Sequence, residues 1–171
     1  MSKEKMTRDT VPEGFTLKLA LVDAIPVIFF GAGMIVVSVL FKSPLFLFGA
    51  LLCLFAGAAK VVWKIIVVLK KKNIWWLFLQ MRILMPIGML LMIAGVIINK
   101  SSVDFHGILS AAMSFPPVLF FAAGIIGMIM MFVFAFKFDS SDVKANWIEQ
   151  LTNGAAQICI FIGLLLTAVS L

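Results

Sequence analysis

From Pro116 to Phe136 the chain reads PPVLFFAAGIIGMIMMFVFAF, without a charged residue. A helix needs about 17–25 mostly apolar residues to cross the hydrocarbon core of a bilayer, so this stretch is long enough to span it. Within lipid, every backbone amide must find a partner inside the protein, and a helix provides those partners within the segment itself. The stretch therefore predicts a transmembrane helix.

Four further apolar runs have the same character. They cover residues 19–41, 44–68, 74–99 and 154–171, and with 116–136 they make five expected spans. Each run is bounded by lysine or by a polar stretch, or ends at the C-terminus. We therefore expect an all-α integral membrane protein with five transmembrane helices.

The composition of the whole chain agrees with this reading. Of its 171 residues, 63% are hydrophobic and 13% are charged, whereas soluble domains have about 45–50% apolar and about 25% charged residues. A soluble fold of this size cannot hide so much apolar surface. We expect a cytoplasmic segment over 1–18, a single membrane domain over 19–171, and the lipid bilayer as its main surroundings.

The basic residues are distributed unevenly between the two sides of the spans. If the N-terminus is cytoplasmic, twelve of the 14 Lys and Arg residues lie inside, and only Lys42 and Lys100 lie outside. Cytoplasmic loops of membrane proteins carry such an excess. The sequence predicts a cytoplasmic N-terminus and an outside C-terminus, in what we expect to be a bacterial plasma membrane. These loops account for the charge of +6, so no nucleic-acid partner is expected.

Residues 106–115 open an alternative with six crossings. This segment, HGILSAAMSF, is too short to span a bilayer alone. We interpret it as a re-entrant or interfacial piece, which is tolerated where protein covers it.

Two pairs of segments resemble each other along the chain. Residues 26–35 read PVIFFGAGMI and residues 117–126 read PVLFFAAGII, identical at seven of ten positions, and CLFAG at 53–57 resembles CIFIG at 159–163. An odd number of crossings separates the copies, so a true repeat is an inverted 2+1+2 arrangement, a recurring transporter construction. The same residue types dominate all membrane spans, so chance similarity is the other interpretation.

Four amide side chains follow the last polar stretch. Their spacings of four, three and four place Asn146, Gln150, Asn153 and Gln157 on one helical face. Asp142 is a good N-cap residue, so we expect a short cytoplasmic interfacial helix that runs into the fifth span with little or no break. Amides in lipid need partners, so this face either lines a polar vestibule or hydrogen-bonds neighbouring helices.

Asp23 is the one carboxylate inside an apolar run, and three cations lie on the cytoplasmic half of their spans. Charge at membrane depth is costly and points to function, although Asp23 is also placed to serve as a helix N-cap. The cations, Lys60, Lys64 and Arg82, either extend to the lipid headgroups or turn inward as partners for Asp23. We take Asp23, Arg82 and the four amides as candidate substrate or pathway residues, and Lys60 and Lys64 as a cytoplasmic cationic cluster.

Residues typical of catalysis are scarce. His106 is the single histidine, and Cys53 and Cys159 both lie inside apolar runs. Membrane metalloproteases need paired histidines and carboxylates, lipid phosphatases need a histidine with Asp or Arg on one loop, and serine hydrolases need a base near the serine. We expect neither an enzyme nor a bound cofactor or metal.

Met81, Met85, Met89 and Met92 form a stripe at helical spacing on the third span. Thioethers bind copper(I), but the chain has no Cys-rich or His-rich loop to supply the ion. Adaptable packing is therefore the favoured interpretation.

Two classes of function remain. A transporter or channel-like carrier of a small solute is favoured by the amide stripe and the inverted similarity. The alternative is a non-catalytic accessory or assembly subunit that docks on another membrane protein, which fits the small size. Either class is compatible with a homo-oligomer or a larger membrane complex.

Overall fold

The computed structural model describes residues 16–138 and 143–171 of the chain. In these residues the regular structure is helical, with no strand. Five helical segments are long and apolar enough to cross a membrane: Leu17–Leu40, Pro44–Lys70, Trp75–Ile98, Pro117–Phe134 and Val143–Val169. The expected all-α architecture with five candidate spans is confirmed.

The first segment consists of two helices, α1 (Leu17–Val22) and α2 (Ala24–Leu40). Thr16 caps α1 by accepting a hydrogen bond from the amide of Leu19 at 3.2 Å. Pro26 lacks the amide that would bond the carbonyl of Val22, so the regular hydrogen-bond pattern is interrupted where α1 ends. Asp23 lies at this interruption.

The remaining segments follow as α3 (Pro44–Lys70), α4 (Trp75–Leu79), α5 (Met81–Ile98), η1 (Lys100–Ser102), α6 (Phe105–Met113), α7 (Pro117–Lys137) and α8 (Val143–Val169). Pro44 and Pro117 stand in the first turns of α3 and α7, where a missing amide costs no helical hydrogen bond. The third span therefore comprises α4 and α5.

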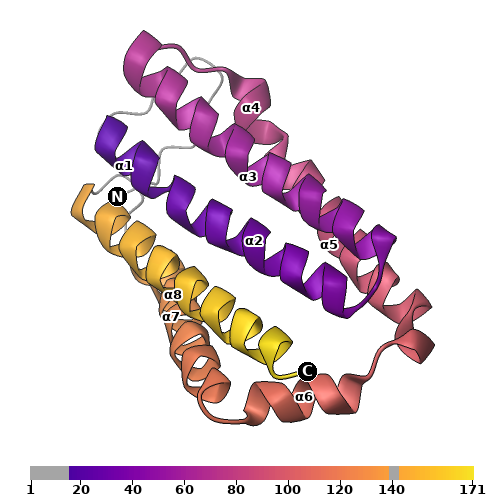
Figure 1. The fold of residues 1–171 in the computed structure, drawn as a ribbon. Coiled ribbons are helices and arrows are strands. Elements are labelled where there is room, and N and C mark those ends of the chain that lie inside the picture. The colour runs from indigo at the N-terminus through magenta and orange to yellow at the C-terminus, as the bar shows by residue number, and fades with distance from the viewer. Residues whose placement is uncertain (1–15, 139–142) are drawn as a thin grey trace.

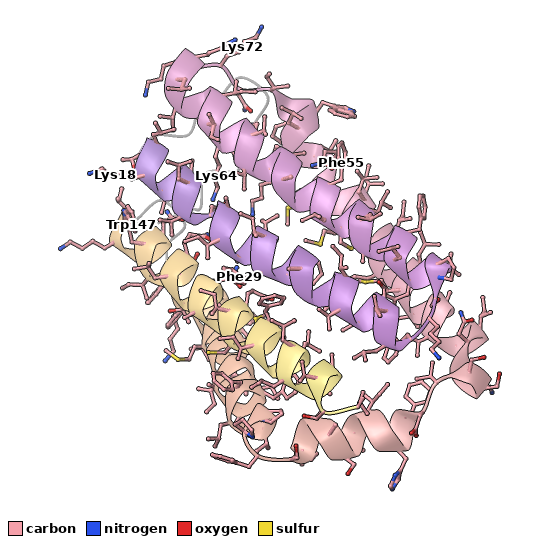
Figure 2. All side chains as sticks on the ribbon, in the orientation of Figure 1. Lys18, Phe29, Phe55, Lys64, Lys72 and Trp147 are labelled. Carbon is pink, nitrogen blue, oxygen red and sulfur yellow. The ribbon has the colours of Figure 1, made fainter. Side chains whose placement is uncertain are left out.

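The long helices lie in the order α5, α3, α2, α8 and α7, with α2 in the middle (Figure 1). Helix α2 packs on α3 on one side and on α8 on the other. Phe29 of α2, labelled in Figure 2, meets Phe161 of α8, with ring centroids 5.5 Å apart. No close backbone contact joins α5 to α7 in the described part of the chain. The outer helices are therefore separate walls on the central three.

Glycine lets α3 and α5 approach closely. A Cβ atom added at Gly88 would lie 2.7 Å from the carbonyl oxygen of Gly49 and 2.5 Å from Sγ of Cys53. A Cβ at Gly95 would lie 2.6 Å from the amide nitrogen of Phe46. Small residues at such crossings are the usual means by which membrane helices pack.

Side-chain hydrogen bonds fasten α5 to α3 at both ends. At one end, Oγ of Ser43 donates to the carbonyl of Gly95 at 3.2 Å and accepts from Nδ2 of Asn99 at 2.9 Å. At the other end, Nε2 of Gln80, between α4 and α5, donates to the carbonyl of Ala56 at 3.1 Å. These bonds fix the register of the two helices.

The two ends of the helical layer differ in charge. Lys70 ends α3, and Lys71 and Lys72 follow it, at the end where α1 and α8 begin. Lys42 and Lys100 lie at the opposite end, with α6 and the C-terminus (Figure 1). Helix α6 has 9 residues, too few to span a bilayer.

Two further expectations concern the fourth and fifth spans. Helix α8 is unbroken from Val143 to Val169, so no break separates residues 143–153 from the fifth span, and Asp142 lies outside the described residues. The two similar segments occupy different surroundings, since α2 is central and α7 is at an edge. The interfacial position of the first turns of α8 and the inverted repeat both stay predictions.

Candidate functional site

A cavity of about 330 Å³ lies between the helices and receives side chains from all five candidate spans. Its volume is near the lower end of the range for ligand pockets, roughly 300–1,000 Å³. Asp23 comes from the junction of α1 and α2. The central helix α2 contributes Pro26, Val27 and Phe30; α3 contributes Cys53, Gly57 and Lys60; the outer helices α5 and α7 contribute Met81, Met85, Met89, Met92 and Met128; and α8 contributes Asn153 and Gln157.

A buried ion pair lies beside this cavity. The Asp23 carboxylate is 2.7 Å from Nζ of Lys64, and their side chains are 9% and 6% exposed. Figure 2 shows Lys64 directed from α3 toward α1 and α2, whereas Lys72 projects away from the helices. Lys64 therefore turns inward, and of the three cations named as partners it is the one that pairs with Asp23.

The expectation that Asp23 acts as an N-cap is wrong. Asp23 occupies the N-cap position of α2, but its side chain forms no capping hydrogen bond. The helix there continues almost directly from α1, because Asp23 itself has helical backbone angles and its amide bonds the carbonyl of Leu19. Because the backbone stays helical there, α2 needs little side-chain capping, and the Asp23 carboxylate pairs with Lys64 instead.

Lys60 lines two cavities. One is the main cavity, and the other is a second cavity of about 390 Å³, whose other lining residues include Phe78, Met81 and Arg82. Lys60 lies one helical turn before Lys64 on α3, so both ammonium groups face the same side of the helix. The guanidinium of Arg82 stacks over the ring of Phe78, with 5.2 Å from Cζ to the ring centroid, and its side chain is exposed. Arg82 thus lines the second cavity and not the main one.

The methionine stripe forms one wall of the main cavity. Met81, Met85, Met89 and Met92 all line it, from the start of α5 to its second half. Met128 adds a fifth thioether from α7, and its Sδ accepts a hydrogen bond from Nε2 of Gln157 at 3.6 Å. The stripe therefore forms a cavity surface as well as a packing surface.

The four amides divide into two groups. Asn153 and Gln157 line the cavity, whereas Asn146 and Gln150 are not among its lining residues. Oε1 of Gln150 is buried and accepts no hydrogen bond from the described residues. All four amides therefore belong to α8, but only the two that lie further along the helix, Asn153 and Gln157, line the cavity.

Several residues of the site were not anticipated. Cys53, Gly57, Phe30 and Met128 line the cavity, yet each belongs to a residue type found throughout membrane spans, so no sequence signal marks them. Gln80 also matters, because it is buried and bonds α3. An amide inside an apolar run was the available signal for Gln80, whereas the amides of α8 were identified by their spacing on one helical face.

The charged groups and amides suit a ligand more than a metal. Within residues 16–138 and 143–171, no three His, Cys, Asp or Glu side chains lie close enough together to hold a metal ion. The cavity offers an ammonium group, two amides and an apolar wall, which together can bind and orient a polar group on a largely apolar molecule. Comparison with protein-family models, curated proteins and solved structures found no match to this chain.

Proposed function

We propose that this protein is a non-catalytic carrier or channel-like conduit for a small solute, which binds in the main cavity. The observation that carries the proposal is the convergence of Asp23, Lys60, Asn153 and Gln157, from three different helices, on one hollow within the candidate membrane spans. Ionisable groups inside membrane proteins are costly and usually line a bundle interior or a water-filled path. A membrane protein without a ligand would bear the cost of these ionisable groups with no functional benefit.

The position of the cavity supports an orientation. Asp23, Lys60 and Asn153 all lie toward the lysine-rich end of the spans, which the distribution of basic residues assigns to the cytoplasm. We propose a cytoplasmic N-terminus, an outside C-terminus and a bacterial plasma membrane. The proposed solute then enters or leaves through a mouth on the cytoplasmic side. An inverted repeat is compatible with this function but is not required for it.

A docking subunit is the second candidate, and the edges of the layer favour it. Among the described helices, α7 packs along one long neighbour, α8, and many of its other side chains are exposed and apolar. Lipid can cover such faces equally well, so they support the docking subunit less than the cavity supports the carrier. A docking subunit has no need of a cavity lined by charged groups and amides.

The test is the accessibility of a single cysteine in proteoliposomes. In a Cys53→Ala, Cys159→Ser background, a membrane-impermeant thiol reagent is applied from one side at a time to Asn153→Cys. A carrier exposes this position to each aqueous side in turn, so we expect modification from both sides. The matched control is Ala155→Cys, which lies on an exposed face of the same helix and should react from neither side because lipid covers it. Modification of Asn153→Cys from one side alone, or from neither, contradicts the proposal.

A further inference from the structure

We propose that the main cavity binds a single-chain amphiphile with a singly charged anionic head, held with its head at Lys60 and its apolar chain along the methionine wall. The inference rests on the proposed function and names the chemical class of its solute. Three features of the cavity carry it: its charge, its polarity gradient and its size.

The charged end of the cavity is positive. Lys64 is paired with Asp23 at 2.7 Å, whereas no carboxylate lies within ion-pair distance of Lys60 in the part of the chain that the structure describes. Glu149 on α8 attracts Lys60 from further away. Among the described residues, Lys60 is the cation that lines the main cavity, and Arg82 adds a second cation on the adjoining cavity. The excess positive charge favours an anion.

The same charge argues against a soft metal cation among the thioethers. A copper(I) ion in the cavity would be repelled by the ammonium of Lys60, and such repulsion is strong away from bulk water. Methionine side chains are flexible and polarisable, and they adapt to apolar partners of varied shape. The five thioethers therefore act here as an apolar wall.

The polarity changes along the length of the cavity. Lys60, Asp23 and Asn153 lie toward the lysine-rich end, together with Met81 at the start of α5. From Met81 to Met92 the wall rises about 16 Å along the helix at about 1.5 Å per residue. At the deep end, Met92 packs in an apolar cluster with Cys53. An amphiphile with one charged end and one apolar end matches this gradient.

The size of the cavity limits the apolar part to one chain. Its volume of about 330 Å³ lies near the lower limit for ligand pockets. The backbones of α5 and α7 make no close contact with each other in residues 16–138 and 143–171, an arrangement that suits entry of a chain sideways from the bilayer. A two-chain phospholipid is too large for it.

The experiment measures binding of radiolabelled laurate to the purified protein in nanodiscs of uncharged phosphatidylcholine. We expect saturable binding that Lys60→Gln weakens about tenfold or more, since contacts between charged groups are among the stronger ones. Lys60→Arg should retain binding, and the matched control Lys70→Gln, an exposed lysine on the same helix, should leave it unchanged. Met89→Trp, at a lining side chain that is 53% exposed and so has room to grow, should also weaken binding by filling the groove.

Competitors test each part of the ligand. Unlabelled laurate should displace the label, whereas dodecyltrimethylammonium, acetate and phosphatidylglycerol should not. Equal displacement by the cation overturns the charge assignment, equal displacement by acetate overturns the apolar wall, and equal displacement by phosphatidylglycerol overturns the single chain. Unchanged binding in a monodisperse Lys60→Gln protein overturns the whole inference.

The two proposals fail in different ways. If Asn153→Cys reacts from both sides but laurate does not bind, the carrier stands and its solute is of another class. If laurate binds as described but Asn153→Cys reacts from one side only, the site is an amphiphile-binding site in a protein that does not transport.

Discussion

The Asp23 carboxylate lies 2.7 Å from the Lys64 ammonium, and the pair joins the junction of α1 and α2 to α3 inside the helical layer. Two charges so deeply buried are tolerable because each offsets the desolvation of the other. Because the Asp23 carboxylate, which lines the cavity, is paired with Lys64, the ammonium of Lys60 in the same lining remains available to a ligand.

Breaking this pair should destabilise the protein more than removing it. Asp23→Asn or Lys64→Met alone leaves one buried charge uncompensated and should cost about 3–5 kcal/mol of unfolding free energy. The double variant should recover most of that loss. Thermal unfolding in mild detergent measures all three, with the exposed Lys70→Met as control. Single variants as stable as the parent protein would show that the pair contributes nothing.

Two amides of α8 should respond differently to replacement by leucine. Gln157→Leu removes a cavity amide and its bond to Met128, so it should lower stability by about 0.6 kcal/mol, the usual size of such bonds in membranes, and abolish solute movement. Gln150→Leu removes a buried oxygen that has no described partner, so stability should stay the same or rise. Thermal unfolding and the flux or laurate assay measure the two effects. Equal loss of activity in both variants contradicts this division.

A glycine pair tests the close packing of α3 and α5. Gly88→Ala places a Cβ 2.7 Å from a backbone oxygen of α3, which cannot rotate away, so we expect a loss of about 1–3 kcal/mol. Gly154→Ala meets its nearest neighbour, Ile25, at 3.5 Å, and should leave stability unchanged or raise it by up to about 1 kcal/mol through helix propensity. The measurement is the unfolding temperature of each variant. A Gly88→Ala protein as stable as the Gly154→Ala protein would refute the close contact.

The orientation in the membrane is open to a direct test. Five spans place the two ends of the chain on opposite sides, and the lysine-rich end should be cytoplasmic. A phosphatase fused to the C-terminus should be active outside the cell, and a fluorescent protein fused to the N-terminus should fluoresce inside it. Matching locations for the two ends would rule out the odd number of crossings.

The helices themselves were predictable because lipid imposes a simple rule. A run such as 116–136 has no charge and is long enough to cross, and its backbone must bond internally, so residues local in sequence decide the structure. The periodicity that placed four methionines on one face of the third span depends likewise on neighbours three and four residues apart. The stripe indeed lines one cavity.

Different signals predicted the fifth span and the start of its helix. Hydropathy placed the span from residue 154, and Asp142 indicated that the helix begins earlier; α8 begins at Val143, because a helix continues through polar residues as long as its backbone bonds are kept. Polarity therefore marks where lipid contact changes and does not mark where the helix begins.

The sequence could not predict which residues from different helices contact each other. Asp23 had three candidate cations, and the choice of Lys64 depends on how α1 and α2 lie against α3. The separation of Gln157 from Gln150, which share a face, depends on where α7 and its Met128 approach α8. Such contacts join residues far apart in the chain.

Sequence determined the five spans, their faces and the uneven charge of their ends, since each follows from local hydrogen bonding and transfer to lipid. Tertiary structure alone decided which faces meet and enclose the cavity, because helix packing in lipid depends on the fit of small residues such as Gly49 and Gly88 and not on hydrophobicity, which every face shares.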